Sequence, residues 1–464
     1  MELSLRPNLK LASDLDAGAR QSRPLEKSSA RIDSSVWIIG AALVALLLKL
    51  AIAYNTFGTN DVATFYMFAR SLNDRGLEWT YRNGFVFFSN FPAFNHPPLT
   101  AYYLRGIYAL TEQRWCQDIG IHFPFLLRLP GIIADFLVVV VLLRISRTDL
   151  RIPTWALALF ALSPVSLMVS GFHGNTDAVM VMFLLTAAWM CLKRRPVWCG
   201  LFFALACQIK IIPLLLVPIV FFFWLARQAA LRFAISFVLL SVTMWIQPLI
   251  KFPTLFLKNV LSYGSYWGGW GITYWLRLTH WRQFDGTGFF NLPPAAALVA
   301  SFLKAGIVSA VLVIGWRRRC LCEGAVINSI AYAWIVFFVF SPGVCPQYMV
   351  WLAPFILILS PAFYGWVTVT SSLFLFFLYN GLAGGLPWFI GISRNNLDGL
   401  NLLSPWSLWP WATLICGMIL LWKKAVDADP SLLLFSFKPC RSQSHDIATA
   451  PPQNRRTAGN SLKR

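Results

Sequence analysis

The sequence of 464 residues has few charged residues: 12% are Asp, Glu, Lys or Arg, whereas 57% are hydrophobic. Soluble globular chains carry about 25% charged residues. So little polar surface cannot cover so many apolar side chains in water, but a lipid bilayer is a suitable solvent for them. The shortage of charge therefore argues against an ordinary soluble protein and indicates an all-α, polytopic membrane protein.

Acidic residues are scarcer than basic ones, because 39 Lys and Arg against 19 Asp and Glu give a net charge of +20. Nucleic-acid-binding proteins can have such a charge. Here, however, basic triplets such as 193–195 and 317–319 adjoin apolar runs, as in the cytoplasmic loops of membrane proteins. We therefore interpret the charge as a topology signal and expect no nucleic-acid partner.

Several motifs of soluble enzymes are missing. The sequence has no Walker A motif, no GxGxxG that opens a soluble fold, no HExxH and no GxSxG. Nucleotide-driven pumping within this chain is therefore not expected. The nine cysteines include no CxxC pair and no metal-ligand spacing, so the cysteines predict no metal site.

Apolar runs of a length that can cross a membrane recur along the chain. We expect about twelve spans in a transmembrane domain at 35–423, between a cytoplasmic tail at 1–34 and a disordered cytoplasmic tail at 424–464. The predicted spans are 36–54, 124–143, 153–171, 177–192, 197–209, 211–225, 231–249, 294–315, 325–341, 347–360, 362–380 and 405–422. Basic residues fall in every second connection, which places both termini in the cytoplasm.

Three longer segments, at about 55–123, 250–293 and 381–404, are then predicted on the non-cytoplasmic side. They are too long to be simple turns. The first contains an amphipathic stretch at 64–72 and a short apolar stretch at 99–110, and we expect the latter to lie at the membrane interface. Polar residues that could carry chemistry gather in and beside these outer segments.

Two candidates for chemistry lie in the first outer segment. Asp61 follows the first span, where a carboxylate could act as a general base on a lipid-borne substrate. It could equally cap a helix that starts at Val62. His96 precedes two prolines that favour a rigid helix start, and it could bind phosphate, orient a sugar, ligate a metal or only anchor the turn.

A second group of candidates lies near the outer ends of later spans. Lys210 breaks the positive-inside pattern at an outer turn, so we expect it either to bind phosphate or to snorkel to headgroups. Arg128 and Asp135 share one helical face; Asp135 is interpreted as structural, and Arg128 as near enough to the outside to reach a phosphate. The turn from His173 to Asp177 opens a helix whose N-terminus can attract an anion, unless it is only a turn.

The last candidates are Gln347 and Tyr348, which could bind sugar hydroxyls, and Arg394, a second candidate for a phosphate. Taken together, these features resemble the GT-C superfamily of membrane glycosyltransferases that use polyprenyl- or dolichyl-phosphate sugars. The resemblance covers about 36–360. The matching elements, in order, are Asp61 after the first span, Pro97-Pro98-Leu99-Thr100-Ala101-Tyr102, Arg128 with Asp135, His173 to Asp177, Lys210, and Gln347-Tyr348 with Trp351 and Pro354. The last of these is similar to polyprenol-phosphate-mannose mannosyltransferases and to the first GPI mannosyltransferase.

The resemblance implies a mannose-like hexose on a polyprenyl-phosphate donor, a glycan or glycolipid acceptor on the outer face, contact with membrane lipid, and inversion at the anomeric carbon. Asp61 would be the general base and should lie near Lys210, with room for a sugar between them. The substrate-binding residues would be His96, Arg128, His173, Asp177, Lys210, Gln347, Tyr348 and Arg394. The family often has Tyr in place of His96, and some members have an acidic pair in place of Asn60-Asp61, so a divalent metal and the identity of the sugar stay open.

A lipid-linked sugar transporter or flippase is the alternative function. It would be expected to have polar residues along several mid-membrane faces, and often repeats. Here the polar residues cluster at outer turns, which favours an enzyme. The outer segments contain no N-x-[ST] sequon, which favours a bacterial inner membrane over the endoplasmic reticulum.

Overall fold

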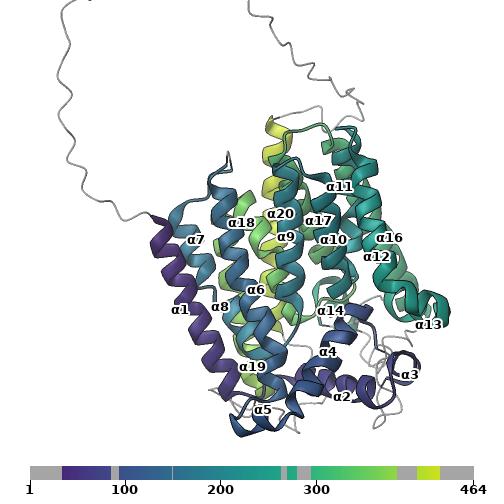
Figure 1. The fold of residues 1–464 in the computed structure, drawn as a ribbon. Helices are drawn as coiled ribbons and strands as arrows, with labels where there is room; N and C mark the ends of the chain where they lie inside the picture. The colour runs from purple at the N-terminus through teal and green to yellow at the C-terminus, as the bar shows by residue number, and fades with distance from the viewer. Residues whose placement is uncertain are drawn as a thin grey trace, which may run out of the picture.

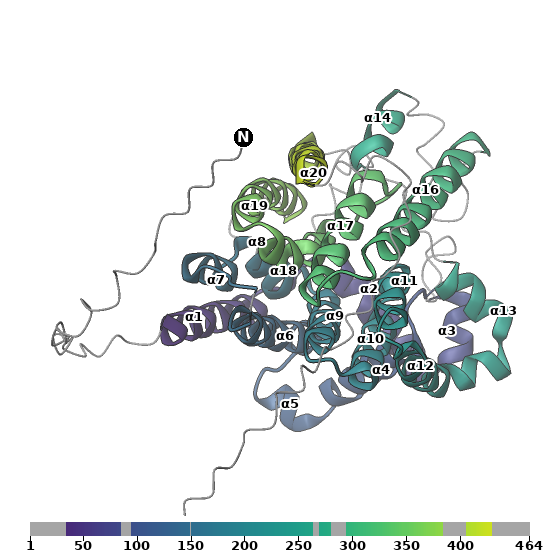
Figure 2. The same cartoon turned by 90° about the horizontal axis from the view of Figure 1, so that it is seen from above.

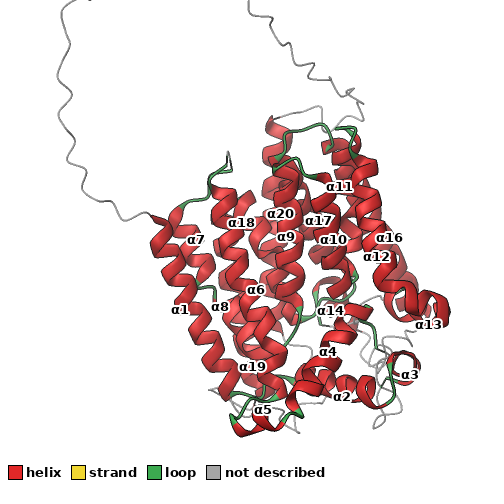
Figure 3. Ribbon diagram, viewed as in Figure 1, coloured by secondary structure: helices red, strands yellow, loops and turns green. Residues whose placement is uncertain are grey.

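The computed structural model describes residues 34–84, 94–148, 150–262, 269–279, 294–383 and 405–428. These residues form helices and the turns between them, with no strand in the described ranges (Figure 3). The all-α prediction is therefore confirmed for this part of the chain. Apart from Ser34 and the end of the last helix, the predicted tails lie outside the described residues.

Seven helical segments in the described ranges are long and apolar enough to cross a membrane. Figure 1 shows them side by side along one direction, as expected of a multi-pass membrane protein. They are α1 (Ser34–Asn55), α6 (Phe123–Ser146), α7 (Thr154–Ala161) continued by α8 (Pro164–Ser166) and η1 (Leu167–His173), α12 (Ala230–Lys251), α16 (Pro294–Arg318), α19 (Pro361–Ala383) and α20 (Leu408–Ala428).

The other five predicted spans are also helical, but each has only 10–17 residues. They are α9 (Asp177–Leu192), α10 (Pro196–Ile209), η2 (Ile212–Leu216) with α11 (Val217–Leu225), α17 (Gly324–Phe340), and η4 (Pro346–Tyr348) with α18 (Met349–Leu359). At about 1.5 Å per residue, α10 with its 14 residues is shorter than a hydrocarbon core of about 30 Å. The count of about twelve spans therefore stays a prediction.

The short helices α9 and α10 pack between other helices, and in the view from above in Figure 2 they lie in a row between α6 and α12. α9 packs on α6, α10 and α18, and α10 packs on α12. Gly200 permits the last of these contacts, because a Cβ there would lie 2.1 Å from Ser236 Oγ. Neighbours on several sides explain why these helices are apolar around most of their circumference.

The first outer segment folds over one end of the bundle as four helices (Figure 1). They are α2 (Asn60–Asp74), α3 (Leu77–Asn83), α4 (Pro98–Thr111) and α5 (Arg114–Asp118). α2 packs on α4, and α4 packs on α6, α10 and α12. The remaining short elements are α13 (Pro253–Phe256), η3 (Leu257–Leu261), α14 (Gly271–Thr279) and η6 (Pro405–Ser407).

Basic loops meet at the other end of the bundle. Arg194 Nη2 lies 2.7 Å from Glu323 Oε1, and Arg227 donates hydrogen bonds to the carbonyls of Arg319 and Leu321. The basic loops that precede α10, α12 and α17 are therefore neighbours. Because α10 begins beside Arg195 and ends before Lys210, these loops and the Lys210 turn lie at opposite ends of that helix.

Candidate active site

Asp61 lies in the first turn of α2, at the edge of a cavity. Thr59 is the N-cap of this helix, and its Oγ1 accepts a hydrogen bond from the Asp61 backbone N at 3.3 Å. The alternative in which Asp61 itself caps the helix is therefore wrong. Helical spacing puts three further cavity residues on the same face as Asp61, at intervals of three, four and seven: Thr64, Phe65 and Phe68.

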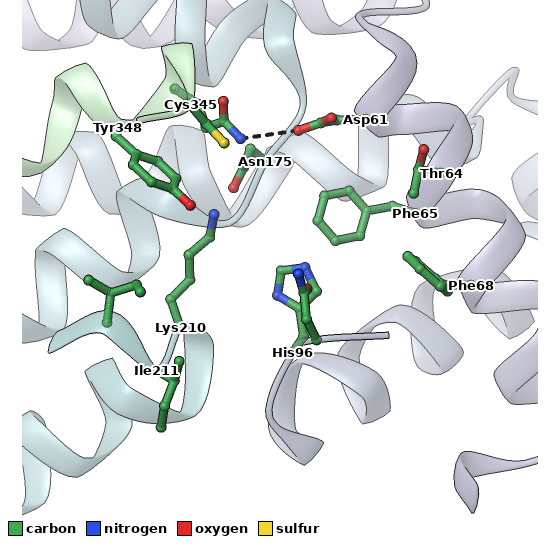
Figure 4. Close-up of a pocket in the computed structure, with 13 residues that line it drawn as sticks. Asp61, Thr64, Phe65, Phe68, His96, Asn175, Lys210, Ile211, Cys345 and Tyr348 are labelled. Atoms are coloured by element: carbon green, nitrogen blue, oxygen red, sulfur yellow. Dashed lines mark hydrogen bonds between the residues drawn. The ribbon is translucent and has the colours of Figure 1, made fainter. Parts of the chain in front are cut away.

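The Asp61 carboxylate contacts two side chains from distant parts of the sequence. His173 Nε2 lies 2.9 Å from Asp61 Oδ2, and Gln347 Nε2 donates to the same oxygen at 3.3 Å, a bond drawn in Figure 4. The other oxygen, Oδ1, has no hydrogen-bond partner among the described residues, and 33% of the side chain is exposed. Asp61 is thus held through one oxygen while the other remains available to a ligand.

Neighbouring groups keep the Asp61 carboxyl ionised. Burial raises its pKa, but His173 first, and then the charge of Lys210, lower it, so that the pKa falls below the usual 3.8. The group is therefore a carboxylate at neutral pH, which is the form that can accept a proton.

A π-helical turn brings His173 to Asp61. This turn is η1, and Gly174 follows it with a φ of +83°. A Cβ on Gly174 would lie 2.3 Å from Val62, so glycine is needed where α2 approaches this turn. Thr59 Oγ1 donates to the His173 carbonyl at 2.9 Å and joins the two segments. Such π-helical turns are frequent at functional sites.

Lys210 follows the last residue of α10 and is buried. Its Nζ lies 3.0 Å from Asp177 Oδ1 and 5.0 Å from the ring centroid of Tyr348. Trp351 Nε1 also donates to Asp177 Oδ1. Because only 10% of the Lys210 side chain is exposed and its ammonium is paired within the protein, the snorkelling alternative is wrong.

The cavity between these groups has a volume of about 140 Å³. A protein cavity of about 150 Å³ can hold a benzene ring, so the space matches a six-membered ring without its substituents. The predicted site residues that line it are Asp61, His96, Lys210, Gln347 and Tyr348. The structure thus brings Asp61 and Lys210 to one cavity with space between them, as expected.

Three predicted site residues that the structure describes do not line the cavity, and a fourth is not described. His173 and Asp177 lie behind it, hydrogen-bonded to Asp61 and ion-paired with Lys210 respectively. Arg128 is fully buried and donates to the backbone carbonyls of Ala53, Thr56, Phe57, Gly171 and Phe172. Arg128 therefore joins the end of α1 to η1. Arg394 lies outside the described residues.

Eight further residues line the cavity that were not predicted as site residues: Thr64, Phe65, Phe68, Asn95, Asn175, Ile211, Ile212 and Cys345. Asn95 and Asn175 could have been predicted from the sequence, because Asn95 precedes His96 and Asn175 lies two residues after His173. The helical spacing from Asp61 was the missed signal for the residues of α2. No group of three or more His, Cys, Asp or Glu that could hold a metal occurs within the described ranges.

The fold and the site together define a helical, multi-pass membrane protein in which a carboxylate, a lysine and amide groups line a cavity at one end of the bundle. Residues 95–227 match a family model described as alpha-(1->6)-mannopyranosyltransferase, N-terminal domain. The match covers less than a third of the chain and includes His96, His173 and Lys210. It supports a relationship to mannosyltransferases. No curated protein matches the chain.

Proposed function

We propose that this protein is an inverting glycosyltransferase of the GT-C type. It moves mannose, or a similar hexose, from a polyprenyl-phosphate donor to a hydroxyl of a glycan or glycolipid acceptor. The observation that carries this proposal is that the Asp61 carboxylate and the Lys210 ammonium line one cavity with room for a six-membered ring. The mannosyltransferase match over 95–227 supports the choice of sugar, and the long apolar helices support a lipid-borne donor.

The reaction is a single displacement. Asp61 accepts the proton of the acceptor hydroxyl, whose oxygen forms a bond to the anomeric carbon while the bond from that carbon to the donor phosphate breaks. The phosphate leaves with the electron pair, and the positive charge of Lys210 stabilises the negative charge that develops on it. The products are a glycoside of inverted configuration and polyprenyl phosphate, and the proton on Asp61 passes to water.

The residues behind the cavity hold these two groups in position. His173 and Gln347 occupy one oxygen of Asp61, which leaves the other oxygen free to accept the proton. Asp177 fixes the Lys210 ammonium beside the ring of Tyr348. Such preorganisation matters because a shift of a reacting group by about 1 Å can lower the rate about a hundredfold.

The site is proposed to face the periplasm of a bacterium, with the lumen of the endoplasmic reticulum as the alternative. Support comes from the basic loops that share Glu323 at the opposite end of the bundle, since basic loops favour the cytoplasmic side. Gln347 and Tyr348 are proposed to bind sugar hydroxyls, and Arg394 to assist Lys210 with the donor phosphate.

The direct test uses purified protein in lipid nanodiscs, radiolabelled polyprenyl-phosphate mannose, and oligomannose or glycolipid acceptors. We expect labelled mannose on the acceptor, bound in the inverted anomeric configuration, and less label from the glucose and galactose donors. In a parallel assay in vesicles, movement of the intact donor between leaflets without any transfer would contradict the proposal and favour the flippase.

A further inference from the structure

His96 is held rigidly on the wall of the cavity, with its ring facing the space beside Lys210 (Figure 4). The ring lies between two aromatic neighbours, with centroid distances of 5.2 Å to Phe65 and 5.5 Å to Phe94. Tyr81 Oη donates to the His96 carbonyl at 2.6 Å, and the following prolines open α4. Both the backbone and the ring of His96 are thus fixed before any ligand binds.

The surroundings of the ring leave one nitrogen free. The carbonyl of Ile209 lies near the ring and favours a proton on the nitrogen that faces it. Burial, and then the charge of Lys210, lower the pKa of His96 to about 3, so the imidazole is neutral at pH 7. A neutral imidazole has one donor and one acceptor nitrogen. The second nitrogen is therefore an acceptor, and no described residue donates a hydrogen bond to it.

We propose that His96 is a specificity-determining residue that accepts a hydrogen bond from one hydroxyl of the transferred hexose. This inference rests on the proposed function. The hexose must lie between its phosphate, beside Lys210, and the acceptor hydroxyl, beside Asp61. His96 lines this same cavity, and its free lone pair needs an O–H or N–H donor.

The same geometry disfavours the other roles considered for His96. A phosphate oxygen and an unprotonated ring nitrogen both present lone pairs, so the phosphate is disfavoured on this side of the cavity. The described residues offer no group of three or more His, Cys, Asp or Glu, which disfavours a metal that the protein alone would hold through His96. Anchoring of the turn needs only the hydrogen bond from Tyr81, and it leaves the acceptor nitrogen unused.

The test is a cycle of variants and deoxy donors. Polyprenyl-phosphate mannose and its 2-, 3-, 4- and 6-deoxy analogues are compared by kcat/KM with the wild type, with His96→Phe and with His122→Phe. His96→Phe keeps an aromatic ring against Phe65 and Phe94 but removes the acceptor, and His122 is a matched histidine that is not among the described residues lining the cavity.

In the wild type and in the His122 control, one deoxy donor should lose about 10–10²-fold, because a buried acceptor is left unsatisfied. In His96→Phe that same analogue should react as well as the full donor, while the ratios for the other analogues stay as in the wild type. If folded His96→Phe shows the same ratio of kcat/KM between the full donor and each deoxy donor as the wild type, the inference is overturned.

A further variant covers the case in which His96→Phe does not fold. His96→Gln retains a side-chain acceptor, so it should keep part of the discrimination at the same hydroxyl; loss of all discrimination in folded protein contradicts the proposal. The outcomes also separate the two proposals. Absence of transfer by the wild type overturns the proposed function, whereas active wild type with unchanged discrimination in the variant overturns only the role of His96.

Discussion

Two buried lysines in this bundle have different surroundings. Lys49 of α1 lies 2.6 Å from Asp135 Oδ2 and donates to Ser166 Oγ, which in turn donates to the same carboxylate. Lys210 has one carboxylate partner, Asp177, and also lines the cavity. The charge of Lys49 is thus balanced within a closed set of three side chains, whereas Lys210 retains a side that can meet a ligand.

The comparison shows that a buried charge alone does not indicate a functional site. A charged residue buried in a transmembrane bundle is treated as functional by default, and both lysines are buried in this bundle. Only the contacts of the folded chain distinguish them. Lys49 joins α1 to α6 and α8, and Gly171 packs against its backbone, so we propose that Lys49 serves assembly of the bundle and that Lys210 serves chemistry.

The largest effect is expected at Asp61, the proposed base, which lines the same cavity as Lys210. Asp61→Asn should lower kcat by about 10²–10⁴-fold, the usual worth of acid–base catalysis, with little change in the thermal unfolding temperature. Asp74→Asn at the exposed end of the same helix is the matched control and should be fully active. Normal turnover by folded Asp61→Asn would remove Asp61 from the mechanism.

The next largest effect is expected at Lys210, where the loss of charge should lower both the activity and the stability of the protein. Lys210→Gln should lose about a hundredfold in kcat/KM, comparable to the loss of one stabilising donor. It should also unfold more readily, because Asp177 is left as an unpaired buried charge, at a cost of about 3–5 kcal/mol.

The double variant Lys210→Gln/Asp177→Asn should regain much of the stability but none of the activity. The readouts are the transfer assay and the thermal unfolding temperature. Recovered activity in this variant would show that Lys210 is no more functional than Lys49.

A smaller effect on activity is expected at the other lysine. Lys49→Met alone should destabilise the protein by about 3–5 kcal/mol, whereas Lys49→Met/Asp135→Leu should be nearly neutral in stability. The double variant should keep kcat within about threefold of the wild type. If it folds normally and yet transfers no sugar, the division between an assembly lysine and a catalytic lysine fails.

The smallest expected effect is a flat pH response at Asp61. A carboxyl whose pKa lies below its usual value remains charged above that value, and its charge is lost only as the pH falls through the lowered pKa. The ratio of wild-type kcat to Asp61→Asn kcat should therefore be constant from about pH 7 to about pH 5. A ratio that declines towards pH 5 would show that the pKa of Asp61 is raised instead.

The helices could be predicted from sequence because an apolar run is a local property. The pairing of side chains could not, because it depends on how helices rotate against one another. α9 is apolar around its circumference, so its pattern does not reveal that Asp177 faces Lys210. Gln347 and Asp61 are 286 residues apart. The sequence suggested that they could meet only because both were predicted to lie on the outer side of the membrane.

The short helices show the same limit. Hydropathy finds α9 and α10 but cannot tell whether lipid or other helices surround them, and therefore cannot decide whether 14 residues in α10 suffice. Arg128 is the clearest difference in role. Its position near an outer surface suggested that Arg128 binds a phosphate. Its guanidinium instead donates hydrogen bonds to backbone carbonyls at the end of α1 and in η1.

The orientation of His173 towards Asp61 depends on the number of residues in the π-helical turn η1. An α-helix advances by about 100° per residue, and a π-helical turn accommodates one extra residue without shifting the helix before it. Loss of any one residue from 167–172 would let the segment wind as an α-helix and turn His173 by about that angle. The imidazole would leave Asp61, and the carbonyls of Gly171 and Phe172 would leave Arg128, in a single step. Insertions and deletions in this turn are thus a more severe test of the site than most substitutions of its side chains.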